Sequence, residues 1–308
     1  MAQEFLSHKF FPEYFKIFQK LRLFSERRID NEKKILKAVA VIISISIVVG
    51  ICILTNAFVG NPISKHLATN TAEKRLEEEY RDRDFEIEKV VYNLKDGNYH
   101  AFIKSPSSID SHFTVLIDMW GNLEIDNYEN DVLTGWNTAN RLGNEYRDKV
   151  DSILDSQSFP YAVDIGFGDI EFIPTEYAKD PSVPDYAIII EDLKLDGEYD
   201  INELGSKAGK LTIYIDDETV SFERLAELIL EVKKIFDNAN VKFYALDFVL
   251  EYPKDENGTK KEGRVEVRDF LYTDIYEEDM IERVKASDEA ANAYYAEQDA
   301  EKYLDEQK

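Results

Sequence analysis

The chain has 308 residues, and its 62 acidic and 37 basic side chains give a formal net charge of −25. This charge excludes nucleic acid as a natural partner, because a phosphate backbone is bound by a cationic surface. A hydrophobic fraction of 44% excludes a wholly disordered chain, and a single cysteine excludes an internal disulfide framework and a multi-thiolate zinc site.

Residues 38–60 form an uncharged, largely apolar run of 23 residues. At about 1.5 Å per residue, a helix of this length measures roughly 35 Å, which is enough to cross a hydrocarbon core. We therefore expect a single transmembrane helix here. The alternatives are a buried core helix and a signal peptide cleaved near Ala57. The run is longer than the apolar region of an ordinary signal peptide, which favours an uncleaved anchor.

The segment before this run, residues 1–37, is basic, with nine Lys or Arg and five Asp or Glu. Its apolar side chains alternate with these charges, which is typical of an amphipathic helix on a membrane face, although docking on a partner helix fits the same pattern. Residues 61–308 carry 28 basic and 57 acidic side chains, a balance of −29. The positive-inside rule therefore predicts a cell-membrane protein that spans the lipid bilayer once, with a cytoplasmic N-terminus and extracytoplasmic C-terminal domains.

The first of two expected small α+β domains covers residues 61–157. Asn61-Pro62 predicts the start of a helix of about five turns. Alternating apolar residues then predict four strands of an antiparallel sheet, with a hairpin turn at Asp96-Gly97. An apolar stripe with steps of three and four residues predicts a long helix over 129–154, and we expect it to cover this preceding sheet.

The second expected α+β domain covers residues 158–285. Ser221 is placed to cap a helix with one apolar face, and a strand over 241–252 pairs through an Asn257-Gly258 turn with a hairpin partner. This pattern is typical of a helix that covers one face of an antiparallel sheet. Residues 286–308 are acidic and lack a continuous apolar stripe, which predicts a solvated helix or a fraying tail.

The chain lacks the short signatures of the common catalytic and nucleotide-binding sites, so we expect no catalytic residue and no cofactor. The nearest approach to a metal site is the segment DLKLDGEYDINE, which matches a twelve-position calcium loop at four acidic residues, Asp192, Asp196, Asp200 and Glu203. Lys194 stands where a ligand oxygen belongs. An acidic turn between a strand and a helix is therefore the simpler interpretation.

Four strings stand out in order along the chain: GNPISKHLATNTAEKRLEEEY, DGNYHAFIKSPSSIDSHF, LTGWNTANRL and LTIYIDDETVSFERLAELILEVK. Together they resemble the YfjL-like proteins of Gram-positive bacteria, over roughly residues 36–285. The resemblance implies a single-pass membrane protein with two small extracytoplasmic domains. It implies no functional residues, because the family has no established activity. Residues 62–126 also look like PepSY-type or cystatin-like modules, which bind or inhibit proteins, in their architecture alone.

We expect a membrane-anchored, extracytoplasmic binding module without catalytic activity, whose partner is a protein or another envelope component. Two alternatives remain open. The first is an envelope enzyme that uses carboxylates, which would require a deep cleft with converging acidic groups of perturbed pKa. The second is a structural or assembly protein that acts through its membrane helix.

Overall fold

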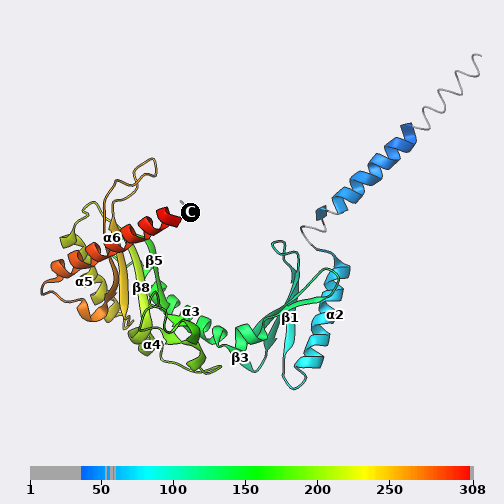
Figure 1. Cartoon of the computed structure of the whole chain (residues 1–308), viewed down its shortest axis with the longest axis horizontal. Helices are drawn as coiled ribbons and strands as arrows, with labels where there is room; N and C mark the ends of the chain where they lie inside the picture. Colours follow the sequence, from blue (N-terminus) through cyan, green and yellow to red (C-terminus); the bar gives the residue numbers. More distant parts are fainter. Residues whose placement is uncertain (1–35, 53, 56–57, 59, 306–308) are drawn as a thin grey trace, which may run out of the picture. The chain divides into compact units, whose positions relative to one another are not determined.

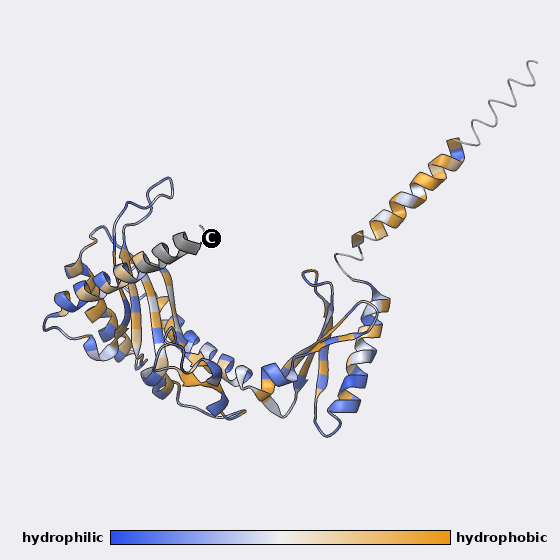
Figure 2. Ribbon diagram, viewed as in Figure 1, coloured by the Kyte–Doolittle hydropathy of each residue, from blue (hydrophilic) through white to orange (hydrophobic). Residues whose placement is uncertain are grey.

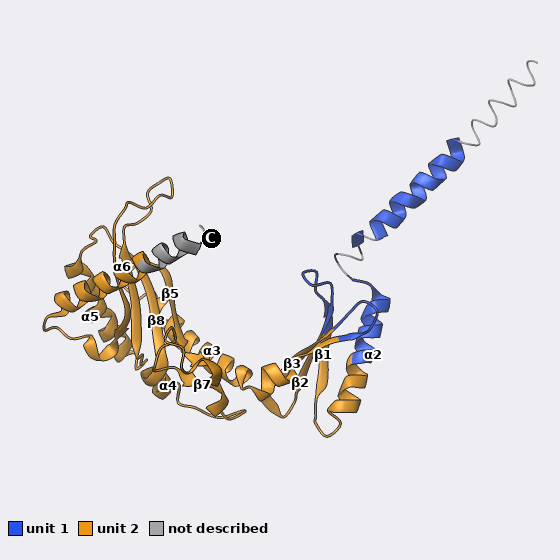
Figure 3. Cartoon of the chain, viewed as in Figure 1, with its two compact units in different colours: residues 1–71, 90–100, 117–123 blue, residues 72–89, 101–116, 124–308 orange. Residues whose placement is uncertain are grey.

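The computed structural model of the chain describes residues 36–52, 54–55, 58 and 60–305 (Figure 1). The chain divides into two compact units, coloured separately in Figure 3. The first unit holds residues 1–71, 90–100 and 117–123, and the second holds residues 72–89, 101–116 and 124–308. All the candidate sites described below belong to the second unit.

The transmembrane helix expected over residues 38–60 is wrong. Within the described part of the chain, no helix is both long and apolar enough to cross a membrane. Residues 36–52 are helical and mostly apolar (Figure 2). Their apolar side chains are exposed. The expected amphipathic segment over 1–37 lies outside the described residues except at its last two positions.

A helix and a four-stranded sheet follow, as predicted. Asn61 caps the N-terminus of helix α2 (Pro62–Glu79), because its side-chain oxygen accepts a hydrogen bond from the Ser64 N–H at 2.8 Å. The sheet has the order β1-β2-β3-β4, and its strands are β1 (Glu86–Tyr92), β2 (Tyr99–Ser105), β3 (Ser108–Ile117) and β4 (Leu123–Asp126). The predicted Asp96-Gly97 turn joins β1 to β2, with Gly97 at φ +75°. The boundary between the two units crosses this sheet.

A second sheet has the order β10-β9-β8-β5, formed by β5 (Val163–Ile170), β8 (Gly209–Asp216), β9 (Ala245–Glu251) and β10 (Arg264–Leu271). The β9–β10 hairpin is antiparallel as predicted, but β8 and β9 run parallel. The expected fully antiparallel sheet is therefore wrong. Helix α5 (Phe222–Asn238), capped by Ser221 as predicted, connects β8 to β9, and a helical crossover returns the chain in the same direction.

Helix α3 (Trp136–Leu154) belongs to the core of the second sheet, although we expected it to cover the first. Its side chains Leu142, Tyr146 and Val150 are fully buried in that core. Gly168 of β5 permits the close approach, because a Cβ there would lie 2.5 Å from the Val150 Cγ2 atom. The predicted helix over 129–154 is also broken. A five-residue π-helical turn ends at Leu133, and Gly135 adopts φ +89° before α3 begins.

Smaller elements complete the second unit. Helix α4 (Ile201–Ala208) leads into β8, and the two-residue strands β6 (Phe172–Ile173) and β7 (Ile188–Ile189) pair in parallel. Helix α6 (Met280–Asp305) packs against the edge strand β10. One contact between them is the hydrogen bond that the Glu266 N–H donates to the Asp288 carboxylate at 2.9 Å. The segment expected to be a solvated helix or a fraying tail is helical as far as Asp305, and among residues 286–296 only Asp288 and Ala291 are buried.

Candidate binding site around helix α3

A buried carboxylate, Asp110, orients the first turns of α3. Asp110 lies in β3 with 1% of its surface exposed. Its two oxygens accept hydrogen bonds from the Arg141 guanidinium, at 2.8 Å from Nε and 3.0 Å from Nη2, and from the Thr138 hydroxyl at 2.8 Å. A bidentate Arg–carboxylate pair is among the stronger and more directional polar contacts in proteins. The face that α3 presents to solvent is therefore set by Asp110.

The same carboxylate also holds the acidic turn at Asp196. The Asp196 N–H donates to Asp110 Oδ2 at 3.1 Å, and the Asp110 N–H donates to Asp196 Oδ1 at 2.9 Å. Arg141 adds a third contact, from Nη2 to the Gly197 carbonyl at 2.9 Å. Burial alone would raise the pKa of Asp110, but hydrogen bonds from Arg141 and Thr138 and the Arg141 charge outweigh it and hold that pKa below its usual value.

The four acidic residues of the segment that partly matches a calcium loop have separate partners or places. Asp196 is hydrogen-bonded to Asp110, and Glu203 pairs with Lys207 at 2.6 Å. Asp200 caps α4, because its side chain accepts from the Asn202 and Glu203 N–H groups. Asp192 ends a short 3-10 turn. Across the described residues, these four carboxylates do not form a group that could hold a metal ion.

Among the described residues, one cluster of three carboxylates has a spacing that could hold a metal ion. The ligand atoms of Asp164, Asp216 and Glu251 lie within 4.8 Å of one another. The Lys260 ammonium already pairs with all three, at 3.1 Å from Asp164 and 2.9 Å from Asp216 and in closest contact with Glu251. A lysine therefore supplies the positive charge that these acids require.

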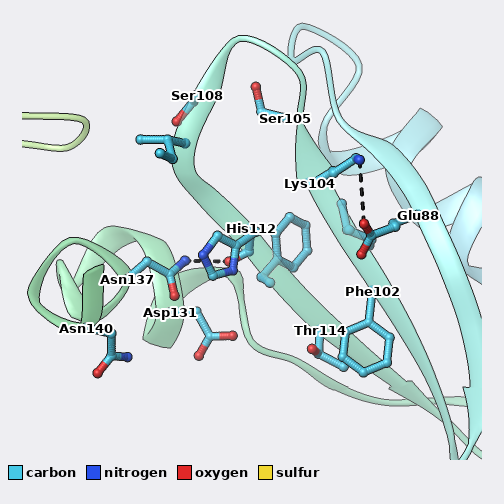
Figure 4. A pocket seen from close by; sticks show the side chains of 13 residues that line it. Glu88, Phe102, Lys104, Ser105, Ser108, His112, Thr114, Asp131, Asn137 and Asn140 are labelled. Atoms are coloured by element: carbon cyan, nitrogen blue, oxygen red, sulfur yellow. Dashed lines mark hydrogen bonds and ion pairs between the residues drawn. The ribbon is translucent and has the colours of Figure 1, made fainter. Parts of the chain in front are cut away.

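A cavity of about 670 Å³ in the second unit lies between the first sheet and the start of α3. We call it the β2–β3 cavity. Figure 4 shows the side chains around it, which include Glu88, Phe102, Lys104, Ser105, Ser108, His112, Thr114, Asp131, Asn137 and Asn140. Aromatic, amide, imidazole and charged groups thus border one space, which is typical of a site for polar recognition.

Two contacts define the walls of the β2–β3 cavity. On one wall the Lys104 ammonium lies 3.6 Å from the Glu88 carboxylate (Figure 4). On the other wall the Asn137 side-chain amide donates to the backbone carbonyls of Asp110 and His112, at 2.8 and 2.5 Å. These bonds fix β3 against α3 and leave the His112 side chain exposed at the cavity.

A second, narrower space of about 350 Å³ runs between α3 and the end of β5. We call it the α3–β5 groove. Asn140 lines both spaces. The helix wall comprises Trp136, Ala139, Asn140, Gly143, Asn144 and Arg147, and the strand wall comprises Asp169, Ile170, Glu171 and Phe172. A Cβ placed on Gly143 would meet no atom within 4 Å, so this glycine leaves the middle of the groove open.

The strand wall of the groove is acidic. Asp169 forms an ion pair with Arg147, whose guanidinium also lies over the Phe167 ring at 5.5 Å from its centroid. Burial raises the pKa of Glu171, while the nearby Lys210 opposes the shift and the carboxylate of Asp269 adds to it. A cation bound beside Glu171 would therefore gain from neutralising a partly desolvated carboxylate.

Some residues of α3 that line the groove lie on the apolar stripe from which we predicted a buried helix face. Trp136 and Gly143 fall on the stripe and were expected in a core with Ala139 and Tyr146. The structure buries Tyr146 and Leu142 in that core, whereas Trp136, Ala139 and Gly143 line the groove. Asn140 and Asn144, four residues apart, mark the solvent-facing side of the same helix. No sequence signal located the opposite wall.

A comparison with models of protein families finds two matches, to the two domains of one family, in successive parts of this chain. The YfjL-like N-terminal domain matches residues 34–127, and the YfjL-like C-terminal domain matches residues 145–285.

This chain belongs to the YfjL-like family.

In this YfjL-like chain, the two matches leave residues 128–144 uncovered. This interval holds Asp131, Asn137, Asn140 and Gly143, which line one or both of the spaces described above. No curated protein and no solved structure matches the chain. The family assignment confirms the resemblance drawn from the four strings.

Proposed function

We propose that this YfjL-like chain is a binding module that recognises a protein partner at the β2–β3 cavity. The main support is the β2–β3 cavity itself, whose borders combine an aromatic ring with amide, imidazole and charged groups. Such a lining provides a hydrophobic contact and several directional hydrogen bonds, which is how binding sites fix the orientation of a ligand. The Asn137 amide holds the α3 wall of the cavity to β3, so little ordering of this wall is needed on binding.

The partner that suits this chain carries a basic segment. A net charge of −25 attracts cationic surfaces and repels anionic ones. This attraction acts mainly within about 10 Å at physiological salt, so specificity has to come from the cavity itself.

A site-specific photo-crosslinker tests this proposal. A photoreactive phenylalanine analogue at Thr114, inside the cavity, is expected to give a discrete adduct in cells that express the full chain. The same group at Glu227 on α5, which is exposed, is the matched control and is expected to give none. The variant His112→Trp, at an exposed residue that lines the cavity but not the α3–β5 groove, narrows the cavity and should abolish the Thr114 adduct. An adduct that is equally strong at Glu227, or none at Thr114, would refute the proposal.

A carboxylate-dependent enzyme is the second candidate, and Glu171 favours it. A groove-lining carboxyl whose pKa is raised by burial is a suitable general acid. The expected result is hydrolysis of a member of an ester, peptide and glycoside substrate panel that is lost in Glu171→Gln and retained in Glu176→Gln. Equal activity of the two variants would count against this role.

A further inference from the structure

We propose that the β2–β3 cavity binds an arginine side chain of the protein partner, with Asp131 pairing with its charge and Asn137 accepting one of its N–H groups. This inference rests on the proposed function and deepens it, because it names the contacting group of the partner and the residues that recognise it. Asn137, Asp131 and His112 all line the cavity (Figure 4).

Asn137 presents to the cavity an oxygen that no described residue uses. Only 7% of the surface of Asn137 is exposed. Its side-chain NH₂ group donates to the Asp110 and His112 carbonyls, and these two bonds fix which end of the amide is the oxygen. That oxygen accepts no hydrogen bond from the described part of the chain, yet protein atoms do not seal it off. An acceptor in this position takes its donor from outside the chain.

Asp131 brings a negative charge without a counter-charge to the same cavity. It lies in the π-helical turn before α3 and is partly buried. Its carboxylate accepts a hydrogen bond from the Asn130 side-chain amide at 2.9 Å, but among the described residues no cationic side chain forms an ion pair with it. A carboxylate can accept about four hydrogen bonds, so Asp131 retains the capacity to bind a cation.

The lysines near the cavity are engaged elsewhere. The Lys104 ammonium is shared between two acids, Glu88 at 3.6 Å and Glu86 at 3.7 Å. The Lys89 ammonium lies over the Phe102 ring, 4.7 Å from its centroid. The cation for the carboxylate on the π-helical turn therefore has to come from a ligand.

These groups suit arginine better than lysine. A guanidinium carries five N–H donors in one plane, so it can pair with the Asp131 carboxylate and donate to the Asn137 oxygen at the same time. Its flat face can also stack on an aromatic ring, and the exposed His112 ring lies at the cavity. An ammonium is a compact point charge that does not stack in this way.

The probe is Nα-acetyl-arginine amide, titrated into the full chain to millimolar concentrations. Nα-acetyl-citrulline amide, in which a neutral urea group replaces the guanidinium, is the matched control ligand. The chain has four histidines, so the NMR signals of the imidazole rings are few, and His112→Gln assigns that of His112. We expect the arginine amide to shift the His112 signal alone and the citrulline amide to shift none. Nα-acetyl-lysine amide should bind about threefold more weakly than the arginine amide.

Two variants test the role of Asp131. Asp131→Asn keeps the size of the side chain and removes its charge, and it should weaken binding of the arginine amide about tenfold. Glu129→Gln removes the same charge from an exposed residue of the same turn that does not line the cavity, and it should bind within a factor of about two of the wild-type chain. Far-UV circular dichroism checks that both variants are folded.

Three results would overturn the inference: no shift of the His112 signal, equal shifts by the arginine and citrulline amides, or unchanged binding by folded Asp131→Asn. Equal binding of the lysine amide would overturn the choice of arginine. The Thr114 crosslink separates this inference from the proposed function. A Thr114 adduct with the same yield in Asp131→Asn would refute the arginine contact and leave the cavity as the binding site. No Thr114 adduct in the otherwise unaltered chain would refute the proposed function, whatever the titration shows.

Discussion

Removal of the Asp110 carboxylate tests whether one buried ion pair holds α3 in place. In Asp110→Ala, the Arg141 guanidinium loses both of its bonds to Asp110, and the Thr138 hydroxyl, which is fully buried, loses its acceptor. Breaking a buried pair from one side costs about 3–5 kcal/mol, because a charge is left uncompensated. Arg141 keeps Glu145 and the Gly197 carbonyl as partners, which places the effect near the lower limit. We therefore expect a loss of about 3 kcal/mol.

Equilibrium urea denaturation of the full chain, followed by far-UV circular dichroism, measures this loss. The matched control is Asp255→Ala, because the Asp255 carboxylate also accepts hydrogen bonds, from two backbone N–H groups at 2.8 Å each, but lies in an exposed turn. The control should change the free energy of unfolding by less than about 1 kcal/mol. The double variant Asp110→Ala/Arg141→Ala should lose much less than the sum of the single variants. An Asp110→Ala loss no larger than the control's, or additive single effects, would refute the reasoning.

The pH dependence has a definite sign. The pKa of Asp110 is lower in the folded chain than in the unfolded chain, so this carboxylate stabilises the fold above its unfolded pKa of about 4. That contribution is lost as the pH falls through the lowered folded pKa. The difference in unfolding free energy between the wild-type chain and Asp110→Asn should therefore be constant from pH 5 to 7 and shrink below about pH 4.

Four further variants test other parts of the fold. Gly143→Ala should raise the unfolding free energy by about 0.5–1 kcal/mol, because alanine favours a helix and the new Cβ meets no atom within 4 Å. Gly135→Ala should lower it by more than about 1 kcal/mol, because Gly135 has φ +89°. Thermal midpoints that shift in opposite directions would confirm both expectations. Asp200→Ala removes the cap of α4 and should cost about 1 kcal/mol in urea denaturation; no change would contradict the capping role. Lys260→Met should cost at most about 1 kcal/mol at pH 7, because the site is partly exposed. That deficit should shrink as acid titrates Asp164, whose pKa the Lys260 hydrogen bond lowers, and a deficit independent of pH would contradict this account.

Local signals in the sequence were enough to predict the helix starts and the tight turns. Asn61 and Ser221 cap helices because a side-chain oxygen reaches an N–H three residues on, which depends only on neighbouring residues. The Asp96-Gly97 turn and the β9–β10 hairpin likewise follow from residues close in the chain. The family resemblance rests on such strings as well. The transmembrane helix, although inferred from an equally local run, was wrong.

The tertiary structure alone decided which surfaces meet. The apolar stripe predicts that one side of α3 is buried, but it does not indicate which sheet that side covers. The second sheet accommodates α3 because Gly168 of β5 has no side chain where Val150 packs. Likewise, the contact between Asp110 and Asp196 joins residues 86 positions apart, which no local pattern encodes. The β2–β3 cavity and the α3–β5 groove exist only because α3 lies where these distant contacts place it. The sequence by itself determined the elements and the family, whereas burial and long-range hydrogen bonds determined the site.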